Sequence, residues 1–164
     1  MKKLFLAVLV GLFMTLTGAA QTVTLNFCGE PGTKPNVVTA DWLNNRTKNY
    51  EPFGTAELVD LKFEKLNKVL QLKSLGKNVE IYTAKPFEVN QDSRFRLQII
   101  YKGKGKLRCG LYGYGEDGRK MTEYQALATP VDSDTWDQRQ FFFNVRKLET
   151  RQVRPYISVT GGTA

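Results

Sequence analysis

Tyrosine, arginine and glutamine side chains alternate with other residues in two stretches near the middle of this 164-residue chain. Arg108, Tyr112 and Tyr114 alternate with apolar residues, and Arg96 and Gln98 do the same a few residues earlier. An aromatic ring packs against the C–H face of a sugar, while guanidinium and amide groups form hydrogen bonds with sugar hydroxyls. These five residues are therefore candidate contacts for a carbohydrate.

Further candidates lie elsewhere in the chain. Tyr82, Arg154 and Tyr156 occupy similar alternating positions, and Trp42 falls in an irregular segment of the kind where binding residues concentrate. We add Trp42 to the candidate site. A plainer interpretation stays open, because tyrosine and phenylalanine are also common on the solvated faces of strands, and consecutive strands need not share one surface.

Residues that most enzymes need are missing. The chain has no histidine, so general acid–base catalysis at neutral pH and serine–histidine triads lack their usual base. Glu116 and Asp117 are adjacent carboxylates, but their setting is typical of a solvated turn. Residues 113–118 match G-x-G-x-x-G without the βαβ unit of a dinucleotide site. We predict a protein that is not an enzyme and has no cofactor and no metal site.

The first twenty residues have the layout of a secretory signal peptide. Lys2 and Lys3 precede an apolar run over residues 4–14, and Gly18 and Ala20 are the small residues of a cleavage site. The run is short for a transmembrane helix. We therefore predict that residues 1–20 are removed, and that residues 21–164 form a domain without a transmembrane segment in the periplasm, at the cell surface or outside the cell.

Charge and cysteine content constrain the exported domain weakly. The whole chain has a net charge of +8, of which the predicted signal peptide contributes two lysines and no acids. No run of five like charges occurs, so the charge indicates solubility as readily as an anionic partner. Cys28 and Cys109 are the two cysteines, and either a disulfide or two separate buried thiols is compatible with an oxidising compartment.

Hydrophobic alternation of period two predicts strands through most of the chain. Residues 95–102 and 107–114 are predicted as a central pair of strands, with Gly103 and Gly105 predicted to reverse the chain between them. Residues 57–74 fit either one helical face or two strands that turn near Asn67, and we favour strands. Residues 119–136 are predicted as a polar connector. Short strands at intervals of roughly 8–12 residues indicate an all-β jelly-roll sandwich over residues 21–164.

The order of three segments suggests a family. FRLQIIYKGKGKLRCGLYGYGEDGR, TWDQRQFFFNV and RPYISVTGG resemble the jelly-roll carbohydrate-binding modules of the galactose-binding-domain-like group, over about residues 57–162. The resemblance implies a jelly-roll fold and a glycan or polysaccharide partner. Such modules continue into a closing strand with acidic residues. Either this chain is the front part of a longer multidomain protein or that strand is absent, and the family's structural calcium site is not expected.

Together these features predict a non-catalytic carbohydrate-binding module or lectin-like domain of an exported protein. One alternative is a structural or adhesive domain that uses the same fold to contact another protein. Another is a binder of anionic polymers or nucleic acid. Export argues against nucleic acid as a partner, and the basic residues are scattered instead of forming a stripe.

Overall fold

The computed structural model describes residues 10–16, 19–25, 37–39, 41–44, 54–64, 66–76 and 78–161. Every regular element in these residues is a β-strand, and every strand pairing is antiparallel. The strands are β1 (Val10–Leu16), β2 (Ala19–Leu25), β3 (Val37–Thr39), β4 (Trp42–Asn44), β5 (Gly54–Phe63), β6 (Leu66–Ser74), β7 (Val79–Thr83), β8 (Phe87–Glu88), β9 (Arg94–Tyr114), β10 (Lys120–Gln125), β11 (Thr129–Asn144) and β12 (Gln152–Thr160). The predicted all-β class is confirmed.

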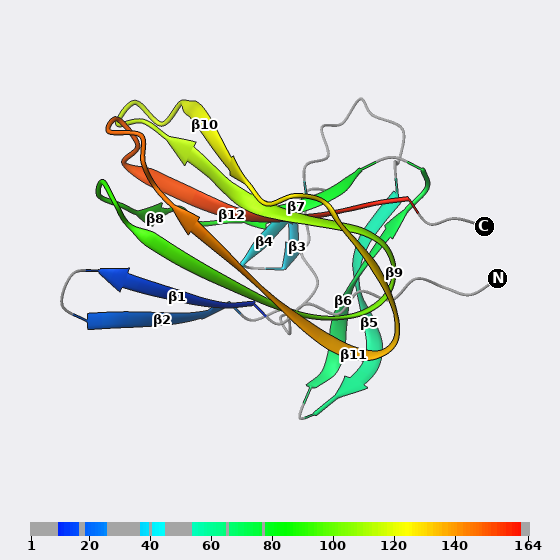
Figure 1. Cartoon of the computed structure of the whole chain (residues 1–164). Helices are drawn as coiled ribbons and strands as arrows, with labels where there is room; N and C mark the ends of the chain where they lie inside the picture. The colour runs from blue at the N-terminus through cyan, green and yellow to red at the C-terminus, as the bar shows by residue number, and fades with distance from the viewer. Residues whose placement is uncertain are drawn as a thin grey trace.

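The 21-residue strand β9 organises a ten-stranded sheet. Along one edge of β9, β11 pairs with residues 94–107 and β10 with residues 110–114. Along the other edge, β1 pairs with residues 94–98 and β12 with residues 106–114. Figure 1 shows β9 curving from one layer, beside β1 and β11, into a second layer, beside β10 and β12. Strands β7, β4 and β3 extend the second layer beyond β12.

The bend of β9 corrects the sequence prediction of a chain reversal at Gly103 and Gly105. Both glycines have positive φ angles, 134° and 147°, yet pairing with β11 continues on either side of them. The partner strand accommodates the bend with an irregularity between Ser133 and Asp137. Glycine tolerates these angles without a Cβ clash, so the backbone turns between layers while the hydrogen-bonded ladder continues. The result is one long bent strand in place of two short ones.

The core lies between the layers, and β9 contributes to it on both sides of its bend. The predicted alternation is confirmed, because its odd-numbered large side chains are buried; they are Phe95, Leu97, Ile99, Tyr101, Leu107, Cys109 and Leu111. Burying an aliphatic or aromatic side chain of this size stabilises a fold by about 1.5–3 kcal/mol. The even-numbered residues, including Arg108, Tyr112 and Tyr114, therefore belong to the outer faces.

The ambiguous segment over residues 57–74 forms strands, as predicted. β5 and β6 pair as an antiparallel hairpin whose turn includes Glu64, which has a positive φ of 51°. The turn is thus a few residues earlier than the predicted position near Asn67. Leu70 and Leu72 are fully buried in the core. The hairpin closes one side of the fold (Figure 1).

The predicted polar connector over residues 119–136 is largely wrong. Residues 120–125 form β10, and residues 129–136 are the first half of β11. These strands have no apolar alternation in the sequence, because both lie at an edge of the sheet and are exposed along much of their length. Their pairing with β9 is what makes them strands.

The N-terminal segments pair with the edge of β9. β1 lies beside residues 94–98 of that strand, and β2 lies outside β1. If residues 1–20 are removed as predicted, β1 and the first residues of β2 leave with them and this edge of β9 is exposed. The rest of the predicted signal peptide lies outside the described residues. No helix in the described part of the chain is long and apolar enough to cross a membrane.

Candidate functional site

The outer face of the second layer carries a regular array of polar and aromatic side chains. In register across β7, β12 and β9, Tyr82 pairs with Tyr156, which pairs with Gly110. Between β12 and β9, the next pairs on the same face are Arg154 opposite Tyr112 and Gln152 opposite Tyr114. Opposed residues in antiparallel strands share a face. Residues distant in sequence are therefore neighbours on one surface.

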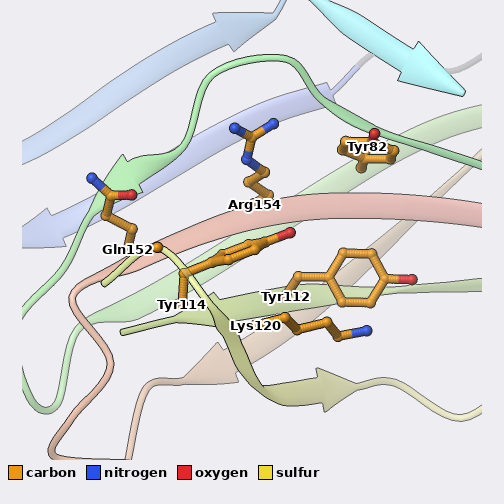
Figure 2. Close-up of a pocket in the computed structure, with 7 residues that line it drawn as sticks. Tyr82, Tyr112, Tyr114, Lys120, Gln152 and Arg154 are labelled. Atoms are coloured by element: carbon orange, nitrogen blue, oxygen red, sulfur yellow. The ribbon is translucent and has the colours of Figure 1, made fainter. Parts of the chain in front are cut away.

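A shallow pocket of about 400 Å³ opens on this face (Figure 2). Its walls come from three adjacent strands, one edge strand and a turn. The lining residues are Tyr82, Tyr112, Tyr114, Gly118, Lys120, Gln152 and Arg154. Gly118 belongs to the tight turn between β9 and β10, where its amide donates to the carbonyl of Gly115 at 3.1 Å.

Two tyrosines cross each other beneath the pocket. The hydroxyl of Tyr112 on β9 donates to Oε1 of Glu80 on β7 at 2.5 Å. The hydroxyl of Tyr156 on β12 donates to Oε1 of Glu123 on β10 at 2.6 Å. The rings stack, with centroids 4.4 Å apart and planes 20° from parallel. Each tyrosine therefore reaches past the other's strand, and the crossing ties four strands together.

Burial and the carboxylate partners fix the protonation of this network. Burial raises the pKa of both Tyr112 and Tyr156, and the hydrogen bonds to Glu80 and Glu123 raise them further. Both hydroxyls therefore stay protonated and act as donors. Burial also raises the pKa of Glu80, although the Tyr112 hydrogen bond and the charge of Arg108 oppose this shift.

Tyr112 supports the pocket more than it offers a surface to a ligand. One of its faces stacks on Tyr156, and the ammonium of Lys120 lies 3.6 Å from its ring centroid. Lys120 also pairs with Glu123 at 3.5 Å. With Tyr156 and Lys120 packed against its ring, Tyr112 has little ring surface left for a sugar. Its role is to position Lys120 at the pocket wall.

Arg154 lies between the other two tyrosines of the pocket. Its guanidinium carbon is 6.0 Å from the ring centroid of Tyr82 and 5.8 Å from that of Tyr114, within the range of cation–π attraction. One terminal nitrogen, Nη1, donates to the carbonyls of Thr83 and Ala84 at 3.2 and 3.0 Å. These bonds hold the guanidinium in place, half-buried, against the aromatic walls.

Three of the six predicted site residues lie on this face. Tyr112 and Tyr114 line the pocket. Arg108 is on the same face but outside the pocket, opposite Ser158. Arg96 and Gln98 lie on the outer face of the first layer, because the bend of β9 takes them there; Gln98 donates to Gln138 at 3.1 Å. The two groups of residues do not share one surface.

The prediction for Trp42 is wrong. Its side chain is 0% exposed and belongs to the hydrophobic core, because residues 42–44 form β4 and pair with β7 instead of forming a surface loop. A ligand on the surface cannot reach it. Trp42 is buried because it lies on the face of β4 that packs against the core.

The sequence did not identify Lys120, Gln152 and Gly118 as site residues. Lys120 lies in the segment expected to be a connector, and its place in the pocket follows from its pairing with Tyr114. Gln152 begins β12, and its Nε2 donates to Glu88 at 2.6 Å. Only the D-G turn pattern at residues 117–118 was a usable signal, and the turn itself is confirmed.

Other candidate chemistry finds little support among the residues described. Cys109 is a free, buried thiol, while Cys28 lies outside the described residues. Burial raises the pKa of Cys109, which keeps it protonated and unreactive. Within the described ranges, no group of three cysteine or acidic side chains is arranged to hold a metal ion. The chain matches no model of a known protein family, and a search of curated proteins finds no match.

Proposed function

We propose that this protein is an exported, non-catalytic domain that binds carbohydrate in the pocket between Tyr82, Tyr114 and Arg154. The observation that carries the proposal is the convergence of these side chains with Gln152 and Lys120 on one hollow of an outer sheet face. Further parts of the proposal are the jelly-roll form of the sandwich and the removal of residues 1–20 during export.

The chemistry of the pocket suits a sugar. Tyrosine rings pack against the C–H groups of a pyranose, and guanidinium, ammonium and amide groups bond its hydroxyls. The amide nitrogen of Gln152 donates to Glu88, so its carbonyl oxygen is the atom suited to accept from a sugar hydroxyl. The pocket is shallow and lies on an outer sheet face, which suits a segment of a longer glycan.

Three carboxylates near the pocket have structural partners. Glu80 and Glu123 accept from Tyr112 and Tyr156, and Glu80 is almost completely buried. Asp117 in the adjoining turn accepts from the amide of Arg119 at 3.0 Å. A pair of glycosidase carboxylates flanks the scissile bond, whereas Glu80 and Glu123 are engaged by the hydroxyls of the two crossed tyrosines. This supports binding without turnover.

Affinity electrophoresis against a panel of neutral and acidic polysaccharides tests the proposal. Tyr114→Ala removes an available ring, and we expect affinity to fall about tenfold, equivalent to about 1.4 kcal/mol. Phe142→Ala is the matched control, because Phe142 is 72% exposed on the outer face of the first layer, opposite Arg96. Retardation lost in Phe142→Ala and kept in Tyr114→Ala would assign the site to the other layer. A protein retarded by no polysaccharide would favour the adhesive alternative.

A further inference from the structure

Positively charged side chains outnumber negatively charged ones among the described residues that line the pocket. Arg154 and Lys120 both line it, and none of the described residues that line it is a carboxylate. Among the described residues, Lys120 has an ion-pair partner in Glu123, whereas Arg154 has no carboxylate within ion-pair distance. In the described part of the chain, the Arg154 charge is offset by two carbonyl oxygens and by the faces of Tyr82 and Tyr114.

The guanidinium of Arg154 is half-buried and has no carboxylate partner among the described residues, so it is available to bind an anionic ligand. Water is partly excluded by the aromatic walls, so the attraction of an anion to Arg154 is stronger there than on an open surface. The two carbonyls engage Nη1, which leaves Nε and Nη2 as the pair of parallel donors that matches a carboxylate.

We propose that the pocket selects an acidic glycan, one whose sugar units carry a carboxylate, and that Arg154 binds that carboxylate while Tyr114 contacts the sugar ring. This inference rests on the proposed function and narrows it to a ligand class. Lys120 contributes a second positive charge from the opposite wall, and Gln152 accepts from a neighbouring hydroxyl. Figure 2 shows the Arg154 and Lys120 side chains rising from different strands, with Tyr114 between them.

Short oligouronates and their methyl esters provide the test. Trimers of galacturonate, glucuronate and mannuronate, each as free acid and as uncharged methyl ester, are titrated calorimetrically against the whole protein. We expect at least one free acid to bind about tenfold more tightly than its own ester, because the carboxylate accepts two charge-assisted hydrogen bonds from Arg154. Arg154→Gln should remove this difference, and Arg154→Lys should restore part of it because the charge remains without the fork. Melting curves check that both variants fold.

A charge-matched control separates recognition from general attraction to a basic protein. Lys106→Gln removes one positive charge from the same strand as Tyr114, at an exposed position eight residues away. It should leave the preference for the acid intact. Lys120→Gln should weaken it and provides a second variant if Arg154→Gln unfolds.

The outcomes distinguish this inference from the function on which it rests. Equal binding of acids and esters would overturn the acidic preference and leave carbohydrate binding standing. Binding of a sulfated trimer but of no uronate, lost in Arg154→Gln, would overturn the choice of a carboxylate. An equal loss of affinity in Lys106→Gln and Arg154→Gln would show that the preference for acids comes from the net charge of the protein, and would overturn the role of Arg154. No binding to any trimer or polysaccharide would overturn both proposals.

Discussion

Tyr112 and Tyr156 cross on the outer face of the sheet with their ring centroids 4.4 Å apart, and each donates to a glutamate on a strand beyond its partner. Tyr156 is 0% exposed although it faces outward, because Tyr112, the edge strand β10 and Glu123 cover it. The crossing forms a rigid aromatic floor. The pocket between Tyr82, Tyr114 and Arg154 lies on that floor.

Removing the Tyr156 hydroxyl should destabilise the fold without leaving a cavity, because the ring remains. Tyr156→Phe keeps the stacked ring but leaves Glu123 without a charge-assisted hydrogen bond, and we expect a loss of about 1–2 kcal/mol in the free energy of unfolding. Tyr82→Phe is the control, since the Tyr82 hydroxyl forms no hydrogen bond with any residue in the described ranges. Urea denaturation of both variants measures the difference. Equal stability would mean that the Tyr156 bond contributes nothing.

Gly110 makes room for the crossing. A Cβ at this position would meet the carbonyl oxygen of Tyr124 and would lie 2.6 Å from a ring carbon of Tyr156. We expect Gly110→Ala to cost about 2–3 kcal/mol, as overpacking does. Gly118→Ala meets nothing within 4 Å and should cost about 1 kcal/mol, from its positive φ alone. A Gly110→Ala protein as stable as Gly118→Ala would contradict the close packing of Tyr156 on β9.

Glu80 should make stability depend on pH in the direction opposite to an ion-paired carboxylate. Burial raises its pKa above the ordinary 4.5, so the folded state holds the proton more tightly than the unfolded state. Below pH 4.5 the Glu80 carboxyl is protonated in both the folded and the unfolded state, and its contribution to the free energy of unfolding is then largest. As pH rises through the folded pKa, this contribution is lost.

The measurement for Glu80 compares two proteins. Unfolding free energies of the wild type and Glu80→Gln are determined by urea denaturation across the acidic to neutral range. As pH rises above 4.5, the wild type should lose stability relative to Glu80→Gln. Tyr112→Phe should enlarge this loss, because it removes the hydrogen bond that lowers the Glu80 pKa. Parallel curves for wild type and Glu80→Gln would show that Glu80 titrates normally.

We predict that the protein is exported and that its mature form begins at Gln21. Gly18 and Ala20 are the small residues that a signal peptidase accepts, and β1 leaves with the removed segment. N-terminal sequencing of secreted material decides the point, with a Gly18→Arg and Ala20→Arg double variant as the control that should remain uncleaved. A secreted protein that begins at Met1 would keep β1 on the edge of β9 and refute the prediction.

The sequence predicts local alternation well and long-range placement poorly. The apolar neighbours Leu107, Cys109 and Leu111 predict that Tyr112 and Tyr114 lie on the outer face, and this is confirmed. Period two fixes which face a side chain occupies but not which layer its strand belongs to. Arg96 and Gln98 were therefore grouped with Tyr112, although the bend at Gly103 and Gly105 separates them.

Trp42 and Lys120 show two further limits. Trp42 lies on a three-residue strand, which is too short to display a period, so its burial is decided by pairing with β7. Lys120 begins an edge strand with no apolar face, so only the register with Tyr114 places it in the pocket. Glycines carry a similar ambiguity, since a positive φ permits a reversal or a bend and the neighbouring strands decide between them.

The most direct test of carbohydrate binding in the tyrosine pocket is the NMR response of the seven tyrosines to a bound oligosaccharide. Protein labelled with ¹³C in the tyrosine rings and with ¹⁵N in the backbone amides is titrated with a trimer of the polysaccharide that retards it most. The ring signals of Tyr82 and Tyr114 should move first and furthest, those of the covered Tyr112 and Tyr156 less, and that of the buried Tyr101 hardly at all. Shifts that leave Tyr82 and Tyr114 unchanged while backbone amides around Gln98 and Phe142 respond would contradict the assignment of the site to this pocket.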